Sequence, residues 1–544
     1  MDAITAPPAP VNEPVLDYAP GSAERVALKE QLAALSAQQR DFKAYIGGEW
    51  ISGSGPEIRV AQPHAHAETL GVIKGAVEVE GAKAVAATKD AAASWRALPF
   101  DERAAVFLRA ADLISGKYRA KLNAATMLGQ GKSAYQAEID SACELIDFLR
   151  FNVSYARDIL AMQPVTNSSG VWNRLDYRSL EGFVYAITPF NFTAIAGNLP
   201  TAPAIMGNCV IWKPSTTQQL SATVFMEILI EAGLPEGVIN MLPGNGKEVS
   251  DAVLTDPSLA GIHFTGSTPT FQSLWRTVGE NISGYRSYPR LVGETGGKDF
   301  VIAHSSADVD TLRTALVRGS FDYAGQKCSA TSRAYIARSV WERMGDDFIA
   351  EVDALKQGDP RDFTNYLGAV IDERAFRKQE AAIARAKSAP GVEIVAGGTS
   401  DDSAGWFVRP TVAVSEDPTD ELFTTEYFGP ILGVHVFDDT DYEGILRIAD
   451  SSSPYGLTGS VFARDRRVIQ ESSEALRFTA GNFYVNDKST GAVVGQQPFG
   501  GGRASGTNDK AGAPHNLLRW TSPRSIKEAL VAPTSSAYPH QGAE

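Results

Sequence analysis

The sequence predicts an α/β protein with parallel, doubly wound sheets, because strand and helix patterns alternate along most of the chain. After residue 182, short apolar segments typical of buried strands (GFVYAIT, 182–188; GVINMLPG, 237–244; GIHFTGS, 261–267) are separated by helical segments such as SATVFMEILIEAG (221–233). A second series of this kind begins near Leu291. Such alternation favours parallel sheets with right-handed crossovers. A chain of 544 residues is too long for one core, so several domains are expected.

Other elements precede or follow this alternation. Residues 1–40 combine a proline-rich leader with a helical segment and are treated as an N-terminal extension. FKAYIGGEWISGSG (42–55) is typical of a β-hairpin with a Gly-Gly turn, and the apolar periodicity of residues 76–160 predicts consecutive helices. NSSGVWNRLDYRSLEG (167–182) is polar and alternating, which predicts a hairpin projecting from the body. The segment after Arg519 is expected to add an edge strand.

Composition limits the classes of function. The formal net charge of −14 disfavours binding to nucleic acid or to an anionic membrane. Three cysteines are too few for a disulfide framework and fit a reducing compartment. The first residues show neither a secretory nor an Arg-rich targeting pattern, so a cytoplasmic location is expected. The uncharged run 182–212 is long enough to cross a bilayer, but its three prolines and three asparagines favour buried strands and a helix.

Standard cofactor and metal motifs are missing from the sequence. GQGKSA (129–134) fits a loose dinucleotide-binding pattern but lies between helical segments instead of after a strand, so it is discounted. The sequence has no P-loop and no HExxH, and its seven histidines do not cluster with its cysteines. No metal site is therefore predicted.

Two predicted strands end in residues suited to a nucleotide. WKPS (212–215) places Lys213 and Ser215 at the end of one strand, and FTGS (264–267) places Gly266 and Ser267 at the end of another. Ligands of doubly wound sheets bind beyond such carboxyl ends, and helix N-termini suit phosphate. Taken singly, WKPS is better explained by a surface lysine at a turn than by a cofactor site, and FTGS by a turn.

Cys328 differs from the other two cysteines. Cys143 and Cys209 lie in apolar helical and strand patterns and are predicted to be core residues. Cys328 lies in GQKCSAT (325–331), between Lys327 and Ser329, and a nearby cation lowers the pKa of a thiol. From this pattern alone, a reactive and a structural role for Cys328 are about equally supported.

Two further motifs carry polar groups in apolar or glycine-rich surroundings. ETGGK (294–298) places Glu294 before two glycines, where a half-buried carboxylate can act as a general base. PFNF (189–192) places the Asn191 amide in an apolar loop, where it can stabilise an oxyanion.

Seven motifs occur in a fixed order: PFNF, WKPS, FTGS, ETGGK, GQKCSA, EYFGP (426–430) and QPFGGGRASG (497–506). Together they resemble the aldehyde dehydrogenase superfamily over nearly the whole chain except the extension. The resemblance implies an α/β aldehyde dehydrogenase fold with a Rossmann-like NAD-binding domain, an α/β catalytic domain and a β-flap for oligomerisation. The expected boundaries are 1–40 for the extension, 41–163 and 183–290 for the NAD-binding domain, 291–518 for the catalytic domain, and 164–182 with 519–544 for the flap.

The resemblance also implies a mechanism. The Cys328 thiolate attacks the aldehyde carbon, and the Asn191 side chain and the Cys328 backbone N–H hold the resulting oxyanion. Hydride then passes to NAD, and Glu294 activates the water that hydrolyses the thioester. Glu426 and Phe428 match positions that place the nicotinamide ribose.

The remaining cofactor residues match positions that hold the adenosine ribose and pyrophosphate; these are Lys213, Ser215, Gly266 and Ser267. Many NAD-using relatives carry an acidic residue directly after WKPS, which rejects a 2′-phosphate, whereas this sequence has Thr216. NAD is the expected cofactor, and NADP is possible but weaker.

Three segments, QAEID…ELIDF (136–148), FDYAGQKCSA (321–330) and NDKSTGAVVGQQPFGG (486–501), resemble one branch of the superfamily. That branch oxidises L-glutamate γ-semialdehyde, formed from 1-pyrroline-5-carboxylate in the second step of proline catabolism. The resemblance implies that the backbone of Gly491 and Ala492 binds the α-carboxylate, as a nest of N–H groups does. Ser329 adds a hydroxyl, and Lys327 adds a positive charge that also acts on the thiol.

Three further residues are assigned to the substrate through the resemblance. Phe192 and Phe499 would enclose the aliphatic chain, and Glu144 matches a buried glutamate near the site. A structural ion pair explains Glu144 at least as well as a substrate contact does.

Alternative functions are a dehydrogenase for another carboxylated semialdehyde, a cofactor-free thiol hydrolase and a non-catalytic binding protein. The loop STGAVVG argues against a different semialdehyde. The presence of WKPS and FTGS argues against a cofactor-free hydrolase, and the intact catalytic residues argue against a non-catalytic protein. The expected partners are the small-molecule substrate, further copies of the chain in a dimer or dimer-based assembly, and a proline dehydrogenase for channelling. Neither nucleic acid nor a membrane is expected.

Overall fold

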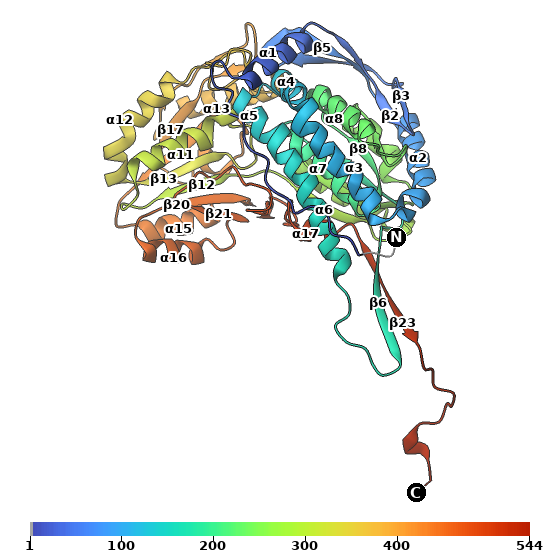
Figure 1. The fold of residues 1–544 in the computed structure, drawn as a ribbon. Coiled ribbons are helices and arrows are strands. Elements are labelled where there is room, and N and C mark those ends of the chain that lie inside the picture. The colour runs from blue at the N-terminus through green and yellow to red at the C-terminus, as the bar shows by residue number, and fades with distance from the viewer. Residues whose placement is uncertain (1–3, 544) are drawn as a thin grey trace.

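The computed structural model describes residues 4–543 as two α/β bodies and a projecting two-stranded ribbon (Figure 1). The sheet of the first body has seven strands in the order β11-β10-β7-β8-β9-β2-β3. Their bounds are β2 (Ala44–Ile46), β3 (Glu49–Ile51), β7 (Phe183–Ile187), β8 (Cys209–Lys213), β9 (Ile239–Met241), β10 (Leu259–Thr265) and β11 (Arg290–Glu294). The strands from β11 to β9 are parallel, as the alternation predicts.

The antiparallel pair β2–β3 forms the edge of this sheet and is the predicted hairpin. Its two turn residues have positive φ angles, +57° at Gly47 and +96° at Gly48, which glycine adopts without strain. Helices of this body are α2 (Glu78–Ala97), α3 (Phe100–Leu113), α4 (Arg119–Gln130), α6 (Leu145–Ala161), α7 (Thr193–Ile205), α8 (Gln219–Glu231), α9 (Gly246–Leu254) and α10 (Thr268–Glu280). Helices α3, α4, α6, α7 and α8 pack together over one face of the sheet (Figure 1).

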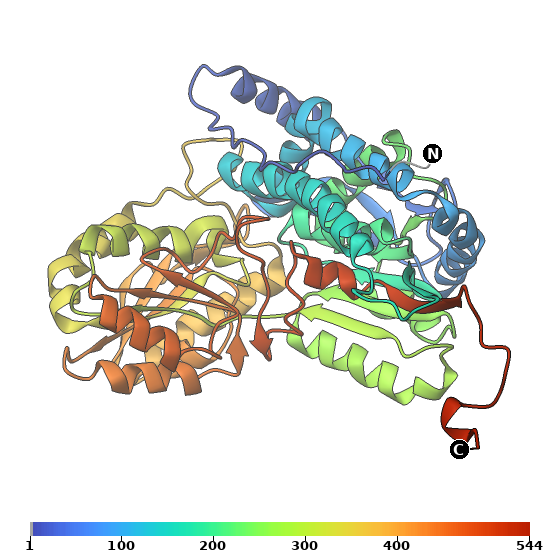
Figure 2. The same ribbon diagram turned by 60° about the horizontal axis from the view of Figure 1, so that its bottom comes forward.

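The second body has its own seven-stranded sheet in the order β14-β17-β18-β13-β12-β20-β21 (Figure 2). Its strands are β12 (Asp299–Ala303), β13 (Thr331–Ala337), β14 (Val392–Ala396), β17 (Thr411–Ser415), β18 (Ile431–Phe437), β20 (Thr458–Phe462) and β21 (Asn482–Val485). All neighbours are parallel except β14 and β17. The helices around it include α11 (Val309–Phe321), α12 (Arg338–Ala354), α13 (Glu373–Ser388), α15 (Tyr442–Ser451) and α16 (Arg466–Ala475).

The uncharged run 182–212 folds as predicted, into strand β7, helix α7 and strand β8. Nearly all of α7 is buried, including Pro200 and Pro203 inside it. Within residues 4–543, no helix is both long and apolar enough to cross a membrane.

The projecting segment differs from the predicted hairpin. Residues 167–182 contribute one strand, β6 (Val171–Arg178), whose antiparallel partner is β23 (Ser522–Ala529) near the other end of the chain. The predicted strand after Arg519 therefore pairs with β6 (Figure 1). A local alternation pattern shows that a segment is a strand but does not identify its partner.

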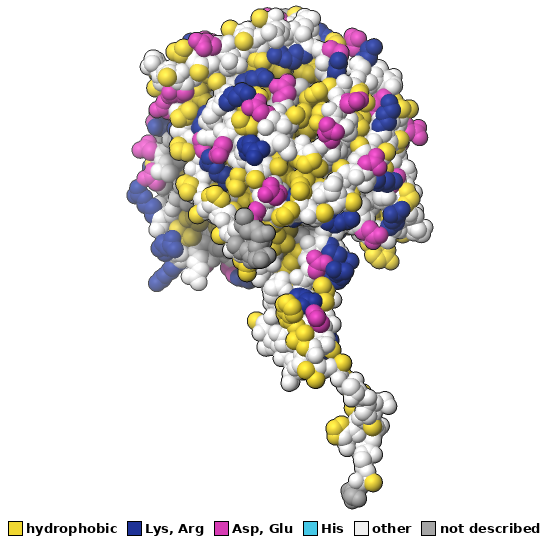
Figure 3. Space-filling model, turned by 45° about the vertical axis from the view of Figure 1, so that its right-hand side comes forward, with side chains coloured by type: hydrophobic (Ala, Val, Ile, Leu, Met, Phe, Trp, Pro, Cys, Tyr) yellow, Lys and Arg dark blue, Asp and Glu magenta, His cyan; other side chains and the backbone are white. Residues whose placement is uncertain are grey.

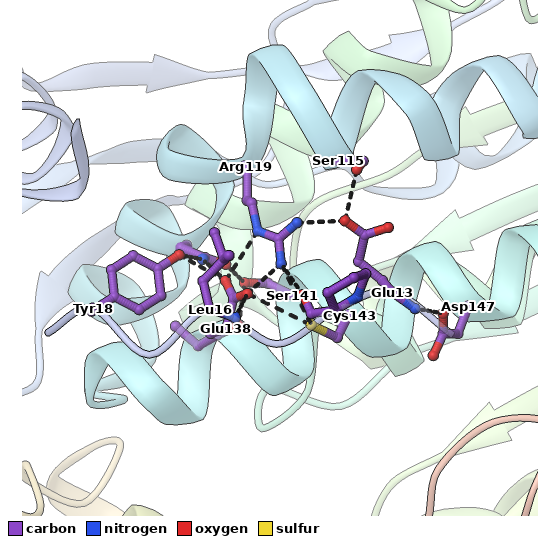
Figure 4. A network of polar contacts seen from close by, with 12 residues as sticks. Glu13, Leu16, Tyr18, Ser115, Arg119, Glu138, Ser141, Cys143 and Asp147 are labelled. Carbon is purple, nitrogen blue, oxygen red and sulfur yellow. Dashed lines mark hydrogen bonds and ion pairs between the residues drawn. The ribbon is translucent and has the colours of Figure 1, made fainter. Parts of the chain in front are cut away.

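The N-terminal segment packs against the first body. Helix α1 (Ala23–Ser36) contacts α4, and its Leu28, Leu32 and Leu35 are buried in the same core as residues of α3, α4 and α6. The residues before α1 run along the helical face, where Figure 4 shows a network of buried polar contacts.

Arg119 is the centre of this network. Its guanidinium donates to Glu13 Oε1 (2.5 Å), to the carbonyl oxygen of Pro14 (2.7 Å) and to both carboxylate oxygens of Glu138. Tyr18 OH also donates to Glu138, at 2.7 Å, and Ser115 donates to Glu13, also at 2.7 Å. Burial raises the pKa of both carboxyls, but these donors outweigh it, and the pKa of each is lowered from 4.5.

Replacing Arg119 by Met is expected to destabilise the protein by about 3–5 kcal/mol, because the buried Glu138 carboxylate loses its cation and Glu13 keeps only Arg150. The difference in the free energy of unfolding between wild type and variant should narrow as the pH falls to 4.5 and below. In the variant, protonation of Glu13 and Glu138 removes the charges that have lost Arg119. In the wild type, the same protonation removes the stability that the ionised carboxylates provide, because their pKa values are lowered in the folded protein. Urea denaturation at several pH values measures this. The control is Arg377→Met, which removes ion pairs on the surface and should lower the free energy of unfolding by less than about 1 kcal/mol. Equal losses of stability in the two variants would contradict the prediction.

Candidate active site

A sharp turn presents Cys328 between the two sheets. The three residues Tyr323, Ala324 and Gly325 have φ angles of +54°, +51° and +66°, and β13 begins three residues after Cys328. A Cβ on Gly325 would lie 2.3 Å from the carbonyl oxygen of Gly429, so only glycine fits here. The left-handed backbone reverses the chain after α11 and places Cys328 at the start of a strand.

Asn191 is held beside this turn. It lies in the loop between β7 and α7, is 3% exposed, and donates from Nδ2 to the carbonyl oxygen of Gln326 at 3.0 Å. Gln326 is fixed in turn, because its Oε1 accepts from the backbone N–H of Ile371 at 2.8 Å. The Cys328 N–H lowers the pKa of its own thiol, although burial outweighs this effect. Asn191 Nδ2 and this N–H are the two donors that an oxyanion requires.

Carboxyl groups surround the thiol. The pKa of Cys328 is raised well above 9.0, first by burial and then by Asp299, Glu294 and Glu426. Asp299 accepts from the backbone N–H of Thr458 at 2.7 Å, and Glu426 accepts from the N–H of Gly297 at 2.9 Å. The resting thiol is therefore protonated.

The expectation that Lys327 lowers the pKa of the thiol is wrong for this structure. Its Nζ lies 3.8 Å from Asp322 Oδ2, and the main causes of the pKa shift of Cys328 are burial and three carboxyl groups, not this ammonium. Burial lowers the pKa of Lys327 to about 8, opposed by Asp322. Neighbouring residues in a turn point to different sides, so adjacency in sequence did not place the ammonium beside the sulfur.

Glu294 ends β11 and is one of the carboxyls near the thiol. Burial raises its pKa well above 4.5, and the charge of Lys510 partly opposes this. Lys510 Nζ donates to the carbonyl oxygens of Gly481 and Gly500, each at 2.8 Å. Glu294 Oε2 is buried without a hydrogen-bond partner, which leaves it free for a water or for substrate.

The cofactor residues lie at the carboxyl edge of the first sheet. Lys213 ends β8 and is 8% exposed, and within residues 4–543 its Nζ has only the carbonyl oxygen of Pro214 as partner, at 3.1 Å. Burial lowers its pKa to about 8. Gly246, the first residue of α9, is close enough that a Cβ there would be 3.5 Å from Lys213 Cε. A buried ammonium beside a helix N-terminus fits a phosphate or ribose ligand.

Three other residues complete this edge. Gly266 follows β10, and its N–H donates to the carbonyl oxygen of Glu294 at 3.1 Å. Ser267 caps α10 by accepting from the N–H of Thr270 at 3.4 Å, and Ser215 shares a 3.1 Å hydrogen bond with Thr217.

Phe428 has a positive φ of +60° and makes a T-shaped contact with Phe190, with ring centroids 5.8 Å apart. Phe190 belongs to the same loop as Asn191, so Phe428 lies close to the thiol region. Glu426 is held nearby by the close approach of Gly296, where a Cβ would be 2.4 Å from Glu426 Oε2.

The glycine-containing loop 489–492 is tied directly to the residue after the thiol. Ser329 Oγ and Thr490 Oγ1 lie 2.7 Å apart, and Ser489 donates to the carbonyl oxygen of Ser329 at 2.9 Å. Gly491, with a φ of +100°, and Ala492 follow. Their exposed backbone lies one or two residues from a contact with the Cys328 turn.

The two aromatic candidates come from different bodies. Phe192 is half-buried directly before α7, and Lys132 Nζ lies 4.0 Å from the centre of its ring. Phe499 is half-buried in the second body, where its backbone forms two hydrogen bonds with Ala511.

Glu144 lies in a group of opposite charges. Burial raises its pKa to about 8, Asp140 and Asp147 add to the shift, and Lys132 and Lys327 oppose it. Glu144 therefore shares its surroundings with a candidate substrate residue, Lys327.

Lys132 and Asp140 were missed by the sequence analysis. Lys132 is fully buried and donates to Asp140 Oδ2 at 2.7 Å. Asp140 accepts from the N–H groups of Thr193 and Ala194 at 2.9 and 2.8 Å, which caps α7 and positions the loop of Asn191. Lys132 belongs to the GQGKSA motif, in which Gly131 ends α4 with a φ of +76°. That lysine was the useful signal in a motif that was discounted because it lies between helical segments.

Within residues 4–543, no group of three or more His, Cys, Asp or Glu side chains is arranged to hold a metal ion.

Comparisons with known proteins agree over nearly the whole chain. The model of the aldehyde dehydrogenase family matches residues 50–526. The delta-1-pyrroline-5-carboxylate dehydrogenase of Dictyostelium discoideum, named as mitochondrial, is 48% identical over 542 residues, 98% of this chain and 96% of that protein. The NAD-bound crystal structure of the corresponding Mycobacterium tuberculosis enzyme has a TM-score of 0.97 and 62% identity, with both chains fully covered. Proline utilization A of Bdellovibrio bacteriovorus is 31% identical with a TM-score of 0.90, and the match covers 96% of this chain and 54% of that one.

Alkylation of Cys328 by iodoacetamide is expected to keep accelerating with pH up to pH 9, because the pKa of the thiol is raised well above 9.0. Lys327→Met should change the rate less than about twofold, since this ammonium is paired with Asp322. Mass spectrometry of the Cys328 peptide measures the rate, and the buried Cys143 and Cys209 serve as slowly labelled internal controls. A large loss of rate in Lys327→Met would restore this lysine as the activating cation.

Proposed function

This chain belongs to the aldehyde dehydrogenase family, and we propose that it oxidises L-glutamate γ-semialdehyde to L-glutamate with NAD. The semialdehyde arises by opening of 1-pyrroline-5-carboxylate, and the reaction is the second step of proline catabolism. The observation that carries the proposal is the direct attachment of loop 489–492 to the turn that presents Cys328. This arrangement supports a site in which the backbone of the loop binds the α-carboxylate while the aldehyde group reaches the thiol.

We assign nucleophilic attack to Cys328. The S–H proton passes to water, the sulfur forms a bond to the aldehyde carbon as the C=O π bond opens, and Asn191 Nδ2 and the Cys328 N–H stabilise the oxyanion of the resulting thiohemiacetal. NAD, when bound, accepts the hydride that leaves this carbon. The carbon is thereby oxidised to a thioester on Cys328.

We assign hydrolysis of the thioester to Glu294. Its free oxygen is available to a water molecule, and the raised pKa makes its carboxylate a stronger base than an exposed one. Proton transfer to Glu294 lets the water oxygen bond to the carbonyl carbon, and the thiol leaves as glutamate forms. The carboxyls around the sulfur favour return of the proton to it.

The proposed cofactor contacts follow from the edge of the first sheet. Lys213 and Ser215 would hold the adenosine ribose, and Gly266 and Ser267 the pyrophosphate at the start of α10. Glu426 and Phe428 would place the nicotinamide ribose near Cys328. Thr216 carries no charge to repel a 2′-phosphate, so NADP is proposed as a weaker substitute.

The proposed substrate contacts divide by chemical group. The N–H groups of Gly491 and Ala492, the Ser329 hydroxyl and the charge of Lys327 would hold the α-carboxylate. Glu144 would face the α-ammonium. Phe192 and Phe499 would enclose the methylene groups between the two ends.

The same proposal includes a domain division and an assembly. We assign residues 1–40 to the extension, 41–163 and 183–290 to NAD binding, 291–518 to catalysis, and 164–182 with 519–544 to the flap. Figure 3 shows hydrophobic side chains on the projecting flap, and Trp172, Leu530 and Val531 are exposed there. Such a patch favours a dimer or a dimer-based assembly, with the flap against another copy.

A proline dehydrogenase partner is a further part of the proposal. This chain spans about half of the Bdellovibrio proline utilization A that it matches. We also propose the cytoplasm as location, on the acidic composition and three cysteines, although the Dictyostelium relative is named as mitochondrial.

Purified protein is expected to form NADH from NAD and 1-pyrroline-5-carboxylate. Cys328→Ala should abolish this activity, and Asn191→Ala should lower kcat by about 100- to 1,000-fold through loss of an oxyanion donor. NADH absorbance measures the rate. Turnover of another carboxylated semialdehyde instead would support the chemistry but reject the proposed substrate. Ester hydrolysis with no NADH formed from any aldehyde would reject the dehydrogenase.

Glu294→Gln is expected to release about one NADH per active site in a burst and then turn over slowly, because thioester hydrolysis loses its base. Since the pKa of Glu294 is raised well above 4.5, the steady-state rate of the wild type should keep rising with pH above 4.5 as this group loses its proton. Rapid-mixing measurements of NADH over a pH series check both points, with Glu443→Gln on exposed α15 as the control. Absence of a burst in Glu294→Gln would indicate that Glu294 acts before or during hydride transfer and not in thioester hydrolysis.

A further inference from the structure

Asn12 joins two parts of the proposed substrate site. Its Nδ2 donates to Asp147 Oδ2 and to the carbonyl oxygen of Val494, each at 2.8 Å. Its Oδ1 accepts from Gln496 Nε2 at 3.0 Å. Asp147 belongs to α6, three residues after Glu144, while Val494 and Gln496 belong to the loop that contains Gly491 and Ala492. One side chain of the N-terminal segment therefore links the loop to the helix.

The loop is held at both ends and is open between them. Ser489 and Thr490 bind the Cys328 turn at its start. Toward its end, Val494 is buried in the core of the first body, and Gly495 approaches Phe151 of α6 so closely that a Cβ would lie 2.2 Å from that ring. Gly491 is exposed in the middle. Without Asn12, residues 494–497 would depend on apolar packing and on the hydrogen bond from Asn482 to the carbonyl oxygen of Pro498 that follows them. Packing fixes the direction of backbone N–H groups less well than a hydrogen bond does.

The segment around Asn12 is itself firmly attached. The N–H of Glu13 donates to Asp147 Oδ1 at 2.8 Å, and the Glu13 carboxylate is bound by Ser115, Arg119 and Arg150. The N–H of Leu16 donates to Glu138 at 2.9 Å. Asn12 thus lies beside a segment that several buried hydrogen bonds and ion pairs hold in place, the network of Figure 4. Because its backbone is fixed, the Asn12 side chain can hold the loop in one position.

We propose that residues 12–18 form a strap that sets the position of loop 489–497, with Asn12 as the positioning residue for recognition of the substrate α-carboxylate. The inference rests on the proposed function in one respect, the assignment of the Gly491 and Ala492 N–H groups to that carboxylate. Asn12 contacts neither the thiol nor the cofactor edge, so its effect falls on substrate affinity and not on the chemical step.

The kinetic test compares Asn12→Ala with Val11→Ala, a neighbouring change at an exposed side chain. Asn12→Ala is expected to raise KM for 1-pyrroline-5-carboxylate by about tenfold, through the loss of hydrogen bonds that fix the loop. The kcat, the KM for NAD and the turnover of propanal, which has no carboxylate, should each stay within about twofold. Val11→Ala should match wild type. An equal loss with propanal, or an unchanged KM for the carboxylated substrate, would overturn the proposal.

Hydrogen–deuterium exchange without substrate tests the strap independently of activity. Amides of residues 489–497 should exchange faster in Asn12→Ala than in wild type or Val11→Ala, while amides of β12 and β13 keep their rates. Unchanged exchange in the loop, or faster exchange throughout the protein, would reject a positioning role. If wild type fails to oxidise 1-pyrroline-5-carboxylate, the proposed function fails, but the exchange result still decides whether the strap exists.

Discussion

The backbone contact between the ETGGK segment and the Cys328 turn is the constraint on which the site depends. A Cβ on Gly297 would lie 2.2 Å from the carbonyl oxygen of Cys328, a distance that no side chain tolerates. The segment links β11 of the first sheet to β12 of the second, so this contact joins the two bodies at the thiol. Glu294 precedes it by three residues and is thereby brought near the sulfur. Two parts of the mechanism are positioned by one close approach.

The electrostatics of the site follow from this geometry. Glu294 and Asp299, at the two ends of the β11–β12 connection, and Glu426, before β18, arrive on two segments that converge on Cys328, and burial strengthens the effect of each charge. The same burial raises the pKa of each of these carboxyls. Burial therefore shifts both the thiol and its neighbouring acids toward their neutral forms, which reduces the cost of several like charges in a small volume. Chemistry in such a site depends on a proton leaving the thiol as the bond forms.

The opposite wall of the site is built by charge pairing. Lys132 pairs with Asp140, which caps α7 and fixes the loop of Asn191. Lys327 lies close to Asp322, and Glu144 lies among these charges. Removing one member of such a buried group leaves another charge unpaired, so the group keeps one geometry. The N-terminal segment adds to this wall through Asp147, which extends the region that shapes the site well beyond the motifs.

The sequence by itself determined the α/β class, the β-hairpin at residues 42–55, the buried strand–helix–strand of residues 182–212 and the family. These depend on local periodicity, turn residues and the order of motifs, which a sequence displays directly. The catalytic candidates Cys328, Asn191 and Glu294 were also selected from local motifs, and the structure brings them to one place.

Only the tertiary structure decided which groups meet across long separations. It paired β6 with β23, directed Lys327 toward Asp322 instead of the thiol, and placed Asn12 against Val494. It also showed that Lys132, in a motif of no evident use, supports the loop of Asn191 through Asp140. A sequence pattern reports the neighbours of a residue along one helix or strand. The direction of a side chain in a turn, and its partner several hundred residues away, depend on how all the elements pack.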